Sequence, residues 1–190
     1  MENSERMVFK PGNMLYPLPV VMVSSGKKGK RPNIVTVAWT GTINSDPPMV
    51  SISLRKSRYS HEIISETKEF VINLTTKELV RDTDYCGVKS GRDIDKFKEC
   101  GLIELEMDGV DCPGIAEAPV CIACKVKEIK ELGSHDMFIA EVVSVKADPK
   151  YMNESGRFDF SLSEPIVYSH GEYYSLGEKL GKFGYSVKKN

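Results

Sequence analysis

The stretch SISLRKSRYSHEII, residues 51–64, joins the end of a strand to the start of a helix through a cluster of cations. Residues 51–54 alternate polar and apolar side chains, as a strand with one buried face does. Three cations then follow within four residues: Arg55, Lys56 and Arg58. A phosphate group is bound by hydrogen-bond donors such as arginine guanidinium groups, serine hydroxyls and the free main-chain amides at the start of a helix. A solvated basic loop before an ordinary helix explains the same residues, and the spacing alone favours that plainer interpretation.

Strand-like segments lie on both sides of this stretch. Each is rich in β-branched residues or alternates apolar with polar side chains. They cover residues 19–25, 33–39, 49–54, 69–74, 118–132 and 136–148. The last two are joined by Gly133-Ser134-His135-Asp136, which predicts a tight hairpin turn.

Helices are fewer and shorter than the strands. They are predicted over residues 57–69, with Ser57 or Ser60 as the N-cap; over 75–87, with a capping signal from Thr75 to Glu78; and over 93–101, with an Asp cap and Gly101 at the end. Because strands and long helices do not alternate regularly, a doubly wound parallel sheet is disfavoured. The pattern predicts a mainly β protein, an antiparallel barrel with short helical insertions, in a single domain over residues 1–190.

Composition restricts the partners that we expect. The 190 residues carry a formal net charge of −1, so a generally basic surface for nucleic acid is not indicated. The opening MENSERMVFKPG is polar and lacks the apolar core of a secretion signal, and no apolar run approaches the ~20 residues of a membrane helix. We therefore expect a cytoplasmic protein that binds neither nucleic acid nor membrane.

Five cysteines are present, two of them in the pattern Cys121-x-x-Cys124. The pattern invites a metal or redox interpretation, but the surrounding segment is strand-like, and residues three apart on a strand point to opposite faces. No second pair supplies the remaining zinc ligands. We expect buried thiols that pack as small apolar side chains, and no metal site.

The segment of residues 33–48 carries the only tryptophan. If it is a strand, Thr36, Ala38 and Thr40 share one face, and Trp39 points the other way. Small side chains allow a flat ring to approach the backbone closely. A core strand with one packed tryptophan explains the same residues, and for a single Trp it is the commoner case.

Three other residues carry candidate chemistry. Ser90 opens a turn before the helix that holds Lys96, and a lysine on a helix is either a solvated charge or a contact to a phosphate or a reduced ring. His135 in the hairpin turn is most simply structural, although its near-neutral pKa suits proton handling if it reaches a ring. The sequence contains no G-x-G-x-x-G after a strand, no phosphate loop and no common hydrolase signature.

Taken in order, these segments resemble the flavin-reductase-like proteins. The resemblance rests on Asn33–Trp39, Ser51–Arg55 with Arg58-Tyr59-Ser60, Cys86-Gly87 with Ser90–Phe97, and Gly133–Asp136 before FIAEV. It covers roughly residues 10–150, and the closing Tyr173–Gly184 is most similar to the flavoredoxin branch. It implies an FMN-binding split β-barrel of antiparallel, Greek-key type, in a homodimer with the flavin near the subunit interface.

The resemblance also implies which residues hold FMN. In chain order they are Thr36, Val37, Ala38, Trp39 and Thr40 along the ring; Ser53, Leu54 and Arg55 along the ring and ribityl chain; Arg58, Tyr59 and Ser60 at the phosphate; and Ser90 and Lys96 as further contacts. His135 matches a histidine that other members carry in a Gly-Asp-His-Thr segment, which reads Gly-Ser-His-Asp in this chain. It is the one candidate catalytic residue. With these matches, the phosphate-binding interpretation of the basic loop is preferred.

Three functions fit these residues. The first is a flavoprotein oxidoreductase in which NADH or NADPH reduces bound FMN, which then passes electrons to flavin or another acceptor. The second is a flavoredoxin-type electron carrier that a redox protein reduces, with no nicotinamide site of its own. The third is a non-redox module that uses the same basic residues to bind another phosphate or a haem-like ligand.

Overall fold

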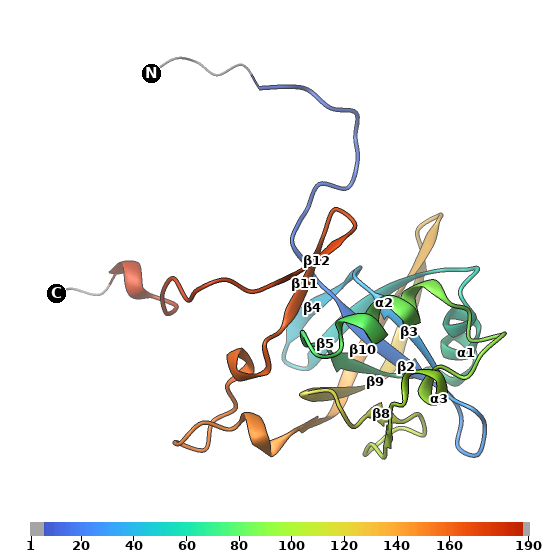
Figure 1. The fold of residues 1–190 in the computed structure, drawn as a ribbon. Coiled ribbons are helices and arrows are strands. Elements are labelled where there is room, and N and C mark those ends of the chain that lie inside the picture. Colours follow the sequence, from blue (N-terminus) through green and yellow to red (C-terminus); the bar gives the residue numbers. More distant parts are fainter. Residues whose placement is uncertain (1–5, 188–190) are drawn as a thin grey trace.

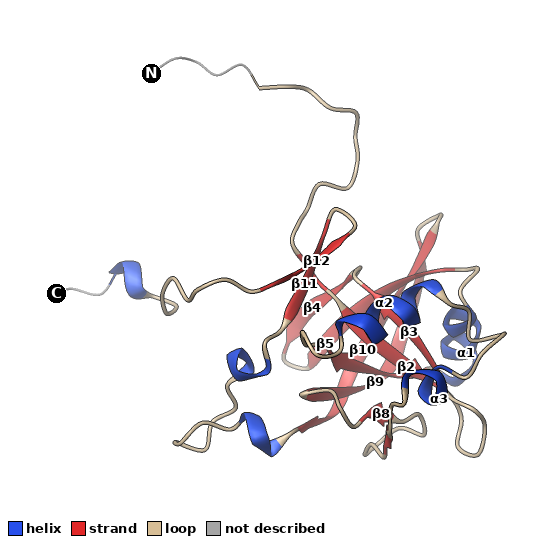
Figure 2. Cartoon of the chain, in the orientation of Figure 1, coloured by secondary structure: helices blue, strands red, loops and turns tan. Residues whose placement is uncertain are grey.

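The computed structural model describes residues 6–187, so the two ends of the predicted 1–190 domain, residues 1–5 and 188–190, lie outside the described residues. Its main element is a sheet of seven strands in the order β3-β2-β6-β9-β10-β5-β4, in which every neighbouring pair is antiparallel (Figures 1 and 2). The seven strands are β2 Val21–Ser25, β3 Asn33–Val37, β4 Thr40–Ser45, β5 Pro48–Arg55, β6 Glu69–Leu74, β9 Val120–Glu131 and β10 His135–Ala147.

The remaining elements are short. The other strands are β1 Leu18–Pro19, β7 Glu104–Leu105, β8 Gly114–Ile115, β11 Ile166–Ser169 and β12 Glu172–Ser175. The α-helices are α1 Tyr59–Thr67, α2 Val80–Val88 and α3 Lys96–Cys100, and the 3₁₀ turns are η1 Pro149–Tyr151, η2 Phe160–Ser163 and η3 Tyr185–Val187. The prediction of a mainly β, antiparallel split barrel with short helical insertions is confirmed.

The sheet curls until one edge strand, β3, contacts β5 near the opposite edge. The two sides do not form a ladder along their length. The Ser53 amide donates to the Trp39 carbonyl at 2.8 Å, which continues the β4–β5 pairing to the point where the chain leaves β3. The barrel is therefore open between β3 and β5.

Both faces of the central strands are buried. Val21, Val23 and Phe70 belong to a cluster inside the curl, whereas Met22 and Val71, their neighbours in sequence, belong to a second cluster on the outer face. Alternate residues of a strand point to opposite faces, so a strand buried twice shows an apolar run. This explains the sequence VVMV at residues 20–23.

The two cysteines of the C-x-x-C pattern follow the same geometry. Cys121 lies in the outer cluster and Cys124 in the inner one, which confirms that they are buried on opposite faces. Burial raises the pKa of Cys121 to about 11 and raises the pKa of Cys124 further. Both side chains are packed thiols.

The first two helices do not begin where the capping signals indicate. The N-cap of α1 is Arg58, rather than Ser57 or Ser60, and no side chain among the described residues caps it. The predicted capping signal at Thr75 is also wrong, because the Thr75 hydroxyl donates to the Val20 carbonyl and α2 begins at residue 80. The third helix is confirmed, with an Asp95 cap and Gly101 in the left-handed region (φ 66°).

The segment predicted as one strand over residues 33–39 breaks after Val37. Ala38 and Trp39 form a bend, and the chain enters a new strand, β4, at Thr40. The expectation that Thr36, Ala38 and Thr40 share one strand face is therefore wrong. The strand β4, with the sequence TGTINS, was not predicted because it is a mostly exposed edge strand with no alternating apolar face.

The C-terminal part adds a small sheet in the order β1-β11-β12 beside the barrel. Figure 1 shows both ends of the chain leaving the body near this sheet. None of the helices within residues 6–187 has the length and apolar content needed to cross a bilayer.

Candidate functional site

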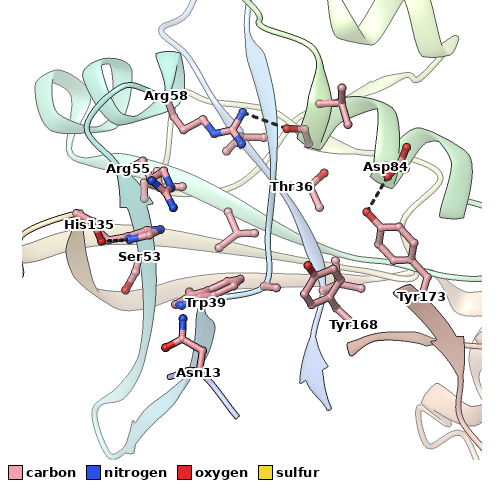
Figure 3. A pocket seen from close by; sticks show the side chains of 18 residues that line it. Asn13, Thr36, Trp39, Ser53, Arg55, Arg58, Asp84, His135, Tyr168 and Tyr173 are labelled. Carbon is pink, nitrogen blue, oxygen red and sulfur yellow. Dashed lines mark hydrogen bonds between the residues drawn. The ribbon is translucent and has the colours of Figure 1, made fainter. Parts of the chain in front are cut away.

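Two adjoining cavities lie at the split of the barrel. The larger has a volume of about 500 Å³ and lies between β3 and β5, with the C-terminal sheet as a further wall (Figure 3). The smaller, about 210 Å³, lies where β5 gives way to α1. Val35, Arg55 and Arg58 line both cavities, so the two form one elongated site.

The larger cavity is a slot with an aromatic side. The rings of Trp39 and His135 lie nearly parallel, with 9° between their planes and 6.1 Å between their centroids. Trp39 reaches this position because the bend at Ala38 and Trp39 turns its side chain into the cavity, where it stays 39% exposed. Thr36 and Ala38 contribute small side chains to the same cavity, so it can accept a flat ring system.

His135 is the first residue of β10 and pairs with Arg55 of β5. Its Nδ1 lies 2.9 Å from the Ser134 hydroxyl oxygen. Burial, and secondarily the positive charge of Arg55, lower the pKa of His135 below its ordinary value. The imidazole is therefore neutral at physiological pH, when it can accept or donate a hydrogen bond without carrying charge.

The smaller cavity gathers positive charge and hydrogen-bond donors. Its lining includes Arg55, Arg58 and Lys96, together with the first residues of α1. The first turn of a helix has main-chain amides without intrahelical acceptors, and its dipole favours an anion. The Ser60 hydroxyl accepts a hydrogen bond from Asn33 Nδ2 at 2.8 Å, so its own proton remains available to a further acceptor.

Lys96 is a buried cation. Its side chain is held by the carbonyl oxygens of Ile34 and Cys86, at 2.6 and 2.7 Å from Nζ, and the residue is only 2% exposed. Burial lowers the pKa of Lys96 to about 8, and the charge of Arg58 contributes in the same direction. The interpretation of Lys96 as a solvated surface charge is therefore wrong.

A third wall comes from the C-terminal sheet and α2. Tyr168 of β11 and Tyr173 of β12 meet edge to face, with 5.9 Å between ring centroids. The Tyr173 hydroxyl donates to Asp84 Oδ1 of α2 at 3.1 Å. In Figure 3 these three side chains lie across the cavity from Arg55 and His135. Burial, followed by the charge of Asp84, raises the pKa of Tyr173 to about 12, so its hydroxyl remains a neutral donor.

The structure brings together all but one of the residues named from the sequence. Thr36, Val37, Ala38, Trp39, Ser53, Leu54, Arg55, Arg58 and His135 line the larger cavity, and Tyr59, Ser60, Ser90 and Lys96 line the smaller one. Thr40 lines neither, because its hydroxyl donates to the Ser51 carbonyl at 2.8 Å in the β4–β5 hairpin.

Sequence reasoning missed several residues of the lining. The principal ones are Asn13, Asn33, Asp84, Lys89, Gly91, Tyr168 and Tyr173. Asn33 and Gly91 are packed closely, since a Cβ on Gly91 would lie 1.8 Å from Asn33 Oδ1, but they belong to distant segments and leave no local pattern in the sequence. Tyr168 and Tyr173 left no pattern either, because they join the site through the C-terminal sheet.

Comparison with known proteins agrees with this architecture. Flavoredoxin of Desulfovibrio vulgaris (Miyazaki F) superposes with a TM-score of 0.89 at 33% identity, covering 97% of this chain and 100% of that one. Flavoredoxin from Methanosarcina acetivorans superposes with a TM-score of 0.87 at 27% identity, with the same coverage. A protein of Pyrococcus abyssi is 32% identical over 167 residues, which is 88% of this chain and 95% of that protein.

The match to a family of proteins covers the whole site. The model of the flavin reductase like domain matches residues 13–177, a span that begins at Asn13 of the larger cavity and includes both tyrosines of the third wall. The chain therefore belongs to the flavin reductase-like family.

Proposed function

We propose that this protein is an FMN-dependent redox protein, with the flavin ring in the larger cavity and the phosphate in the smaller one. The observation that carries the proposal is the pairing of the two cavities. One is a slot beside stacked aromatic rings, and the other is a cationic corner at a helix start, and they share Arg55 and Arg58. FMN has the matching form, a planar ring system joined by a short chain to a phosphate.

The donors in the smaller cavity fit a phosphate. Arginine pairs with phosphate oxygens through a charge-assisted and often bidentate contact. Arg58 already donates to the Gly87 carbonyl at 3.1 Å, which holds its guanidinium against the end of α2. Further hydrogen-bond donors for a phosphate are the Ser60 hydroxyl, the first main-chain amides of α1 and the Lys96 ammonium.

When bound, FMN supplies the hydride and electron transfer chemistry, and the protein supplies binding, orientation and electrostatics. In this arrangement Trp39 and the small side chains of Thr36 and Ala38 orient the ring. His135, kept neutral by its surroundings, is the group that would hold a proton or hydrogen bond at the edge of the slot. Arg55 and Arg58, which line both cavities, would also offset negative charge gained on reduction.

The first form of the function is NAD(P)H-dependent reduction of flavin or another acceptor. The volume of the larger cavity, about 500 Å³, supports this form, because a second ring next to a bound flavin would be held in contact with it. The second form is an electron carrier without a nicotinamide site. The similarity to two flavoredoxins over 97% of the chain favours this alternative.

One sequence of measurements tests these proposals. Purified protein is titrated with FMN while flavin fluorescence and absorbance are recorded, and saturable binding near one FMN per chain is expected. The loaded protein is then mixed anaerobically with NADH, NADPH or a reduced iron–sulfur protein. Bleaching by a nicotinamide nucleotide supports the enzyme, and bleaching by the iron–sulfur protein alone supports the carrier. A protein that ignores FMN at all concentrations refutes both.

We also propose that the protein acts as a homodimer. Support comes from the apolar side chains of the two chain ends, which leave the body in Figure 1. Val8 is 97% exposed, Leu180 84% and Phe183 109%, although such residues are normally covered. Light scattering coupled to gel filtration is expected to give twice the 21.2 kDa mass of the chain. A monomer at micromolar concentration would contradict this proposal.

A further inference from the structure

We propose that Asp84 makes the flavin site selective for uncharged or cationic planar rings as the second reactant, and that it acts through its charge. This inference rests on the proposed function, because it concerns the molecule that lies beside the bound flavin. It assigns a role to the third wall, which holding FMN does not require.

The charges around the two cavities are separated. Among the described residues that line them, the cations are Arg55, Arg58, Lys89 and Lys96, and Asp84 is the one carboxylate. All four cations line the smaller cavity, and Arg55 and Arg58 also line the larger one, where Arg55 lies with His135 across from Asp84 (Figure 3). The site is therefore positive where the phosphate would lie and negative at the opposite wall.

The negative wall is also an aromatic one. Tyr168 and Tyr173 present their rings to the larger cavity next to Asp84, and the Tyr173 hydroxyl fixes the carboxylate by donating to it. Because the pKa of Tyr173 is raised to about 12, the pair carries one negative charge at neutral pH. Aromatic walls favour a planar ring, whereas a carboxylate beside them opposes an anionic one.

The effect is measured with three probes that share a planar ring and differ in charge: benzoate, benzamide and 1-methylnicotinamide. Each is titrated into the FMN-loaded protein, and its Kd is taken from calorimetry and from the change in the flavin absorption spectrum. We expect benzamide and 1-methylnicotinamide to bind more tightly than benzoate. In Asp84→Asn the Kd of benzoate falls and that of 1-methylnicotinamide rises, each by about three- to tenfold, while benzamide is unchanged.

Two matched variants separate charge from packing. Asp82→Asn removes the same charge from the same helix, but Asp82 lies outside both cavities and acts on Cys100 instead, so its probe affinities are expected to match the wild type. Tyr173→Phe keeps the Asp84 charge and removes only the hydrogen bond, so the order of the three probes is retained. High salt shrinks the difference between benzoate and benzamide in the wild type.

Several results would overturn the inference. They are an unchanged benzoate Kd in Asp84→Asn, the same change in Asp82→Asn, a reordering of the probes in Tyr173→Phe, or no probe binding to the loaded protein. A failure of the proposed function gives a different result, because FMN itself then does not bind and the loaded protein cannot be prepared.

Discussion

Replacing Arg58 with alanine tests where the phosphate lies. Arg58 lines both cavities, and its Nη1 donates to the Gly87 carbonyl, so its guanidinium is already positioned at the junction. The variant loses one charge-assisted contact to the phosphate, while Arg55 and the start of α1 remain. A hydrogen bond to a charged group contributes about 1.5–3 kcal/mol, so the Kd for FMN is expected to rise roughly 10- to 150-fold.

Riboflavin, which has the same ring and no phosphate, provides the internal comparison. The affinity for riboflavin is expected to be the same in wild type and Arg58→Ala. The loss of affinity then appears only with FMN, and it measures the interaction between Arg58 and the phosphate. Arg81→Ala is the matched control, since Arg81 is an exposed arginine of α2 that lines neither cavity. Fluorescence titration of both flavins measures all six affinities. Equal losses of FMN and riboflavin binding would show that Arg58 supports the fold of the site rather than the phosphate.

Three further predictions concern the same site. FMN affinity is expected to fall as the pH rises through about 8, the pKa of Lys96, because the ammonium that attracts the phosphate loses its proton. Calorimetry from pH 7 to 9.5 measures the affinity, and an affinity that does not change with pH would contradict the prediction. His135 is expected to titrate below the ordinary histidine pKa of about 6.5, and Arg55→Ala is expected to raise that pKa because a positive charge is removed, as NMR titration of the ring protons would show. Gly91→Ala places a Cβ 1.8 Å from Asn33 Oδ1. Overpacking of this kind typically costs about 1–3 kcal/mol, so urea unfolding is expected to give a lower free energy of unfolding. A wild-type free energy of unfolding would show that the loop moves to accommodate the methyl group.

Strands with a clear apolar pattern could be predicted from the sequence. The long hairpin of β9 and β10 and the opposite faces of Cys121 and Cys124 follow from the two-residue period of a strand. The cationic corner was also visible, because Arg55, Arg58 and the start of α1 are close in sequence. Their closeness in sequence was enough to predict that these groups lie together.

Features that depend on distant parts of the chain could not be predicted. Lys96 is buried because its ammonium donates hydrogen bonds to the carbonyls of Ile34 and Cys86. Neither carbonyl belongs to the helix that holds Lys96, so the helix pattern does not reveal the contact. The break after Val37 leaves no mark in NIVTVAW, which reads as one strand. The Tyr173 contact to Asp84 joins residues 89 positions apart.

The lining of the larger cavity includes Asn13 near one end of the chain and Tyr173 near the other, so segments far apart in the sequence contribute to it. During synthesis the third wall is therefore missing until β12 has left the ribosome. A nascent chain that stops before this strand has the cationic corner without the enclosing tyrosines. The complete lining of the larger cavity therefore requires the chain as far as Tyr173.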